Sequence, residues 1–152
     1  MLSNKVKYAL KALTYLAREY GRGPVLIAEL SARERIPKKF LELILLELKN
    51  HGLLQSKKGK GGGYALNKSP DLITIGCVLR LIEGPLAPLA CVSQSAYKRC
   101  EECEAEATCG LRMVMKEVRD ATARILDGTS LQDILDRVER ATAGTRDLMY
   151  HI

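Results

Sequence analysis

Apolar residues recur every three or four positions in three successive stretches at the start of the chain. This spacing is typical of amphipathic helices and predicts them over residues 2–20, 25–36 and 37–51. Ser3 is placed to cap the first helix, and Pro37 falls in the first turn of the third, where no backbone N–H is needed. Each stretch ends beside a glycine or proline, so short helices with tight connections are expected.

Two short strand-like runs follow, LLQSKK over residues 53–58 and YALN over residues 64–67. The residues between them are GKGGG, which predicts a hairpin with a flexible basic tip. Three helices followed by a hairpin is the element order of a winged helix-turn-helix. In this interpretation the helix from Pro37 enters the major groove and the hairpin is the wing.

The second half of the chain has helical stretches on both sides of an irregular segment. A helix is predicted over residues 74–82, whereas residues 85–106 show no periodicity. A long helix over residues 111–126 comes next, and Ser130 with Asp133 opens a last helix, expected to be short and frayed over the final ten residues. The long helix has an apolar stripe that the small N-terminal core could not wholly cover, so it is predicted to form a dimer interface. The stripe consists of Leu111, Val114, Met115, Val118, Thr122, Ile125 and Leu126.

The expected fold class is mainly α with a small β-hairpin, a winged helix-turn-helix plus a long C-terminal dimerisation helix. Residues 1–84 would form the DNA-binding domain, residues 85–108 a cysteine-rich sensor loop, and residues 109–142 the dimerisation helix with a short final helix. No apolar run could span a membrane and no secretory signal opens the chain, so a cytoplasmic protein without a membrane partner is expected. The two isolated histidines offer no nucleophile–base set, and we expect no enzyme activity.

Positive charge is concentrated in the first half of the chain. Residues 1–70 contain 14 Lys and Arg against 5 Asp and Glu, a balance of +9, whereas residues 71–152 contain 10 against 13, a balance of −3. This asymmetry favours a polyanion-binding head, with solvated surface lysines as the plainer alternative. The glycine-rich tip matches no P-loop, so a nucleotide site is disfavoured. The residues predicted to contact DNA are Lys38, Lys39, Phe40, Glu42, Lys57, Lys58, Lys60, Gly61, Gly62 and Tyr64.

Four of the five cysteines fall within nineteen residues, in the run CVSQSAYKRCEECEAEATCG. Thiolates crowded into one loop can hold a soft metal centre, either an iron–sulfur cluster or tetrahedral zinc, and a metal-free thiol switch is the further alternative. Nearby glutamates would oppose a bare thiolate. The fifth cysteine, Cys77, lies in an apolar helix and is expected to be buried.

The string LKNHGLLQSKKGKGGGYAL, with IPKKFLE before it and ITIGCVLRLIEGPLAPLAC after it, resembles the IscR/NsrR/CymR family of bacterial winged-helix regulators. The resemblance runs from about Met1 to Leu135 and is most specific in the GGGY wing and the GPL-to-cysteine run. It implies a homodimer, a palindromic operator of double-stranded DNA and, in many members, an iron–sulfur cluster. It also implies that Glu42 discriminates between operators.

The resemblance implies three metal ligands, Cys91, Cys103 and Cys109. At the positions where relatives supply a fourth ligand this chain has Arg112 and Lys7, neither of which can serve. We therefore expect Cys100 to complete the set around a 2Fe–2S or 4Fe–4S cluster. The alternative fourth ligand is a carboxylate of the same loop, such as Glu101, Glu102, Glu104 or Glu106.

These observations predict a DNA-binding transcription regulator, most simply a repressor, that senses iron–sulfur, redox or nitric oxide status. The rival hypothesis is a metal-independent or zinc-containing regulator controlled by a protein partner or by thiol oxidation.

Overall fold

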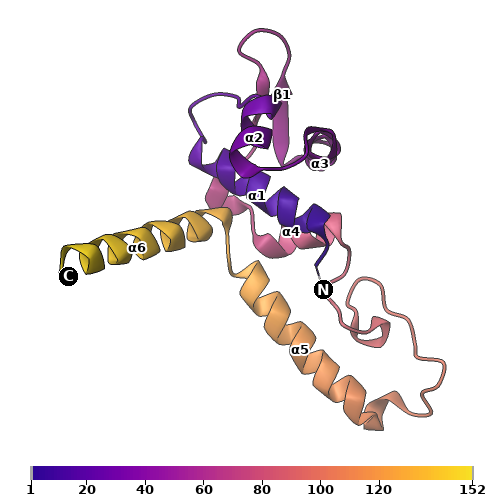
Figure 1. The fold of residues 1–152 in the computed structure, drawn as a ribbon. Coiled ribbons are helices and arrows are strands. Elements are labelled where there is room, and N and C mark those ends of the chain that lie inside the picture. Colours follow the sequence, from indigo (N-terminus) through magenta and orange to yellow (C-terminus); the bar gives the residue numbers. More distant parts are fainter. Residues whose placement is uncertain (1, 152) are drawn as a thin grey trace.

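Three helices at the N-terminal end form a helix-turn-helix unit in the computed structural model, which describes residues 2–151 (Figure 1). They are α1 (Asn4–Arg18), α2 (Ile27–Glu34) and α3 (Lys38–Asn50). Ser31 closes the turn between α2 and α3, because its carbonyl accepts from the N–H of Ile36 at 3.1 Å and its hydroxyl donates to the Ile36 carbonyl at 2.6 Å. The predicted N-cap Ser3 is confirmed, with its hydroxyl 3.3 Å from the backbone nitrogen of Val6.

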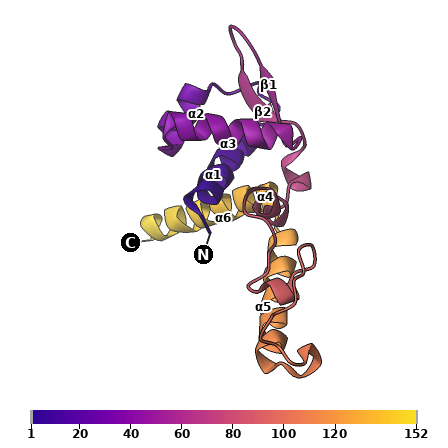
Figure 2. The same cartoon turned by 90° about the vertical axis from the view of Figure 1, so that its right-hand side faces the viewer.

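The wing consists of β1 (Leu54–Lys57) and β2 (Gly63–Leu66), paired antiparallel from Leu54–Leu66 to Lys57–Gly63. Its base is attached to the segment before α2, because Val25 and Tyr64 exchange two backbone hydrogen bonds of 2.8 and 2.9 Å. Figure 2 shows the hairpin rising above α3. The predicted order of helices and hairpin is confirmed.

An apolar core surrounds α1, which contacts α2, α3, α4 (Ile75–Ile82) and α6 (Leu131–Tyr150). Thr74 caps α4, because its hydroxyl accepts a hydrogen bond from the backbone N–H of Cys77. The largest fully buried side chains include Leu13, Leu16, Leu30, Leu41, Leu45, Leu79 and Leu131. Leucine therefore carries the packing in a chain with a single Phe and no Trp.

The long helix α5 (Gly110–Asp127) projects away from this core, and the connection from α4 runs beside it (Figures 1 and 2). That connection contains two short 3₁₀ turns, η2 (Ala90–Val92) and η3 (Glu106–Thr108), and a third, η1 (Pro70–Leu72), precedes α4.

The expectation of a short, frayed last helix is wrong. Ser130 and Asp133 do form the predicted capping box, but α6 then continues for 20 residues to Tyr150. The physical reason is local, because no proline follows Ser130 and the residues after Val138 are mostly tolerant of a helix. Within residues 2–151, no helix is both long and apolar enough to cross a membrane.

Candidate DNA-binding surface and cysteine loop

The first turns of α3 present the side chains predicted to contact DNA. Lys38, Lys39 and Glu42 are exposed, while the opposite side of the helix is buried in the core. The ring of Phe40 is partly exposed and packs edge-on against Tyr8 of α1, with ring centroids 5.7 Å apart. This aromatic pair holds the first turn of α3 against α1. The positions of Lys38 and Lys39 relative to the core are therefore fixed.

The wing presents its lysines from a hairpin whose shape depends on glycine. Lys57, Lys58 and Lys60 are all exposed. Gly62 is buried, and a Cβ there would lie 2.2 Å from the carbonyl oxygen of Lys57. A Cβ on Gly63 would lie 2.1 Å from the Val25 carbonyl oxygen. Glycine at these two positions is therefore required for the hairpin to close and dock, independently of any nucleic acid.

The other predicted wing residues, Gly61 and Tyr64, lie on either side of this constriction. Gly61 is exposed at the tip with φ +73°, in the left-handed region that glycine adopts easily. Tyr64 is half-buried at the base of the wing and packs against the core. Of the two, Gly61 has the more open backbone for an approaching phosphate.

The cysteine-rich segment connects α4 to α5. Cys91 lies in η2 and is only 8% exposed. Cys100 is exposed, whereas Cys103 and Cys109 are half-buried. Cys109 is the N-cap of α5, where its sulfur accepts from the N–H of Arg112 at 3.5 Å. The last ligand candidate is thus part of the helix start itself.

Two of these thiols have raised pKa values. A hydrogen bond to the Glu102 carboxylate, 3.1 Å long, is the main cause that raises the pKa of Cys100. Burial is the first cause that raises the pKa of Cys103, followed by the charge of Cys109 and a hydrogen bond to it. Both shifts favour the protonated thiol near neutral pH. A bound cation would reverse this preference, because it stabilises thiolate directly.

Arg112 holds the Cys91 turn against α5. Its Nε donates to the carbonyl oxygen of Cys91 at 3.3 Å, across 21 residues of sequence. Arg112 occupies a position at which the family resemblance places a metal ligand in some members, and in this chain its side chain contacts the backbone instead.

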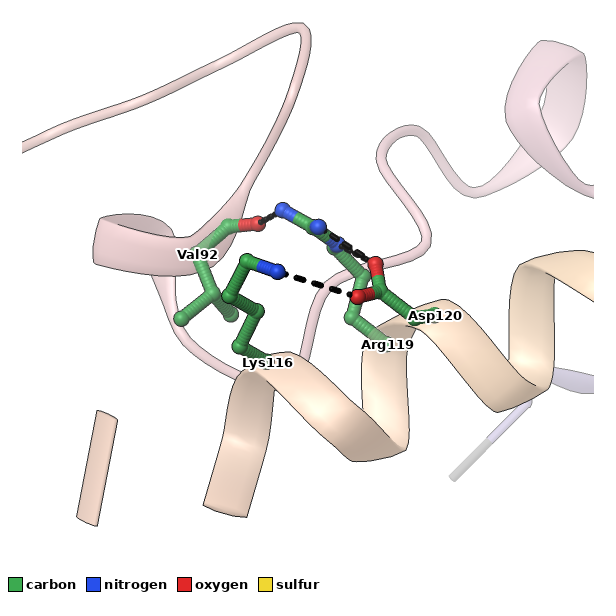
Figure 3. Close-up of polar contacts among 4 residues, drawn as sticks. All are labelled: Val92, Lys116, Arg119 and Asp120. Carbon is green, nitrogen blue, oxygen red and sulfur yellow. Dashed lines mark hydrogen bonds and ion pairs between the residues drawn. The ribbon is translucent and has the colours of Figure 1, made fainter. Parts of the chain in front are cut away.

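Arg119, two helical turns further along α5, makes the second attachment (Figure 3). One of its guanidinium nitrogens donates to the Val92 carbonyl, and its Nε donates to Asp120 at 2.9 Å. Lys116 also pairs with Asp120, at 3.3 Å. The turn that contains Cys91 is therefore positioned by α5, the helix predicted to form the dimer.

The donor chemistry of the loop suits a soft metal, since it offers four cysteine sulfurs. The geometry is not that of an assembled site. Within the described part of the chain no three His, Cys, Asp or Glu side chains are grouped closely enough to hold a metal ion. Binding a cluster would require the Cys91 turn and residues 100–109 to close together.

The expectation that Cys77 is buried is wrong, because its side chain is exposed on α4. The buried residues of α4 are Ile75, Gly76, Val78 and Leu79, and Cys77 falls on the other face. The apolar run ITIGCVLRLI suggested burial all round, but α4 is covered on one side only.

The wing, the exposed lysines of α3 and the helix-turn-helix define a DNA-binding transcription regulator. The chain belongs to the Rrf2 family: residues 2–137 match the model of that family, described as an iron-dependent transcriptional regulator. This confirms the resemblance inferred from the wing and the cysteine run.

The names of similar proteins support this assignment. An Rrf2-like helix-turn-helix regulator of Rhodobacter capsulatus is 44% identical over 138 residues, which cover 89% of this chain and 92% of that protein. CymR of Bacillus subtilis is 32% identical, with 88% of each chain covered. These relatives are transcription regulators, which confirms the expectation that the chain is not an enzyme.

Solved structures confirm the fold class. The structure of B. subtilis CymR, described as a global cysteine regulator, superposes with a TM-score of 0.76 at 31% identity, covering 90% of this chain and 97% of that one. The IscR structure of T. potens gives a TM-score of 0.74 at 27% identity, with 93% and 90% covered.

Proposed function

We propose that this Rrf2-family regulator binds a palindromic operator as a homodimer and that an iron–sulfur cluster in its cysteine loop controls the occupancy of that operator. The observation that carries the proposal is the attachment of the loop to α5. Cys109 caps this helix, and Arg112 holds the Cys91 turn on it. A chemical change at the cysteines would thus act directly on the helix proposed to join the two subunits.

The proposed DNA contacts are divided between base edges and phosphates. Lys38, Lys39 and the wing lysines would bind phosphates and position the domain. Glu42 would accept from cytosine N4 in the major groove, which makes it a base-selective contact. A two-fold dimer presents two α3 helices, and this symmetry is the reason for expecting a palindromic operator.

The proposed ligands are Cys91, Cys103 and Cys109, with Cys100 as the fourth. Cysteine thiolates are the usual ligands of 2Fe–2S and 4Fe–4S clusters, and the bound group would supply sensitivity to oxygen, nitric oxide or iron supply. Besides burial, the charge of Cys109 helps to raise the pKa of Cys103, and this interaction supports a shared centre. Zinc is the alternative metal, because four thiolates also form a tetrahedral zinc site.

Anaerobic purification followed by absorbance spectroscopy and iron and sulfide analysis tests this proposal. Serine at Cys91, Cys103 or Cys109 should abolish cluster assembly, because a hydroxyl is rarely deprotonated. Serine at Cys100 should leave a labile or spectrally altered centre, since Glu102 lies beside it and could partly replace the thiolate. A Cys100→Ser protein that keeps the spectrum, iron content and oxygen stability of the parent would place the fourth ligand elsewhere.

Besides burial, the charge of Cys109 raises the pKa of Cys103, so the two thiols lie near each other, and this pair favours a second candidate, control by thiol oxidation. In this case the two thiols lose two protons and two electrons to an oxidant such as hydrogen peroxide, and one disulfide forms. Mass spectrometry of metal-free protein after peroxide treatment would show the loss of two hydrogens from the peptide pair. An unchanged mass, with all thiols still available for alkylation, would exclude this route.

A further inference from the structure

The outward face of α3 contains two exposed leucines. Leu43 is 66% exposed and Leu46 is 47% exposed. They are three residues apart and therefore lie on the same face of the helix, opposite the buried Leu41 and Leu45. A single surface leucine needs no explanation, but two on one face form an apolar patch at the centre of the proposed DNA-binding surface.

The charges around this patch indicate what would cover it. Lys38 and Lys39 precede it in the first turn of α3, and the wing adds further exposed lysines. Glu47, the acidic residue that follows Leu46, forms an ion pair with Lys5 at 2.6 Å. An apolar patch bordered by lysines is complementary to a polyanion with apolar groups between its charges. Duplex DNA fits this description in the major groove, where thymine exposes its 5-methyl group between the phosphate backbones.

The spacing of the two leucines fits neighbouring base pairs. Three residues of α-helix advance about 4.5 Å along the axis, close to the rise of about 3.4 Å per base pair. Glu42, one residue before Leu43, points to an adjacent part of the same face. The face therefore combines one acceptor for cytosine with two apolar contacts.

We propose that Leu43 and Leu46 recognise the 5-methyl groups of thymines at neighbouring base pairs in each operator half-site. This inference rests on the proposed placement of α3 in the major groove. It adds two specificity-determining residues to Glu42 and gives a chemical class of operator, in which two neighbouring thymines lie beside the base pair that Glu42 contacts.

The test uses the full-length protein and a duplex that it selects from a randomised library. Each thymine of the selected duplex is replaced in turn by uracil, which removes only the methyl group, and the dissociation constant is measured by fluorescence anisotropy. Removal of one buried methyl group should weaken binding about fourfold at the contacted thymines. In Leu43→Ala or Leu46→Ala the penalty at one of these thymines should vanish, because the methyl group no longer has a partner in the variant.

A matched control is Leu72→Ala, since Leu72 is 68% exposed but lies in η1, outside the α3 face. It should keep every uracil penalty of the parent. Alanine favours the helix, and circular dichroism verifies that α3 and the fold are retained in the two leucine variants. A second variant, Leu43→Gln, should lose the preference for thymine when selection on the library is repeated.

The inference is overturned if no uracil substitution weakens binding by the parent, or if both leucine variants retain all the parent's penalties. A uniform loss of affinity for every duplex in the leucine variants would also overturn it, and would indicate that the patch is structural or contacts another protein.

Replacement of Lys38 and Lys39 by alanine separates failure of the leucine inference from failure of the proposed DNA-binding surface. If these lysine variants lose affinity while uracil substitutions are silent, α3 binds DNA but its leucines do not select thymine. If the lysine variants bind unchanged, the surface itself is misplaced.

Discussion

Individual side chains in this protein have roles that depend on which side of a helix the fold covers. Arg112 follows the cysteine run and contacts the backbone of Cys91. Cys77 has the same chemistry as the loop cysteines but lies on the exposed face of α4, in another part of the molecule. Its neighbour Gly76 is buried where a Cβ would collide with Asp127, which is ion-paired to Arg80 at 2.6 Å.

We predict that Cys77→Ser changes the free energy of unfolding by no more than about 0.5 kcal/mol, because substitutions at exposed sites without special contacts are usually nearly neutral. Urea unfolding followed by circular dichroism measures this. The same variant should contain as much iron as the parent after anaerobic purification. A loss of iron in Cys77→Ser would mean that this thiol, and not only the four in the loop, takes part in the metal centre.

At the scale of elements, the base of the wing is attached to the rest of the domain, while its tip presents the residues proposed to contact DNA. Gly62 and Gly63 allow close backbone approaches that no other residue permits, and Val25 pairs with Tyr64 to hold the base. The tip, with Lys58 and Lys60, is outside these constraints and is exposed. The element thus separates the residues that shape it from those proposed to bind phosphate.

Replacing Lys58 and Lys60 together by alanine should weaken binding to all duplex sequences alike. For each phosphate that is no longer neutralised, the slope of log affinity against log salt should become shallower by about 0.9, because fewer counterions are released. Anisotropy titrations at several salt concentrations measure the slope. Lys68→Ala, an exposed lysine beyond the hairpin, serves as the control and should leave the slope unchanged. An unaltered slope in the double variant would argue against phosphate binding by the wing tip.

At the scale of the whole molecule, α5 stands clear of the core (Figure 1). One side of this helix is apolar and exposed. The exposed members of the predicted stripe include Leu111, Val114, Val118 and Ile125. An exposed apolar side of this length is typical of a protein interface. The cysteine loop is attached to a neighbouring face of the same helix through Arg112 and Arg119.

Val118 is 45% exposed in the single chain and is proposed to be covered at the dimer interface. Val118→Glu should convert the dimer to monomers, because the glutamate would place an unpaired charge in that interface. Affinity for a palindromic operator should fall in parallel, since two half-sites are no longer bound by one particle. Analytical ultracentrifugation measures the first effect and anisotropy the second. Met113→Glu is the control, because Met113 is exposed on the other side of the same helix. A Val118→Glu protein that sediments as an intact dimer would exclude this interface.

Much of the fold follows from short stretches of sequence. The caps Ser3 and Thr74 and the Ser130–Asp133 box each act on a backbone N–H three residues away, so their effect is visible without a tertiary structure. The lysines of the wing and the cysteine run are equally local. These features predicted the DNA-binding class and the candidate metal ligands.

Only the tertiary structure decided which faces are covered. The exposure of Cys77, Leu43 and Leu46 depends on where other helices pack, and periodicity alone does not place those helices. The attachment of Cys91 to Arg112 joins residues 21 apart, and the Gly63 approach to Val25 joins residues 38 apart. Contacts over such separations arise from the packing of the whole chain, because no neighbouring residue carries a signal for them.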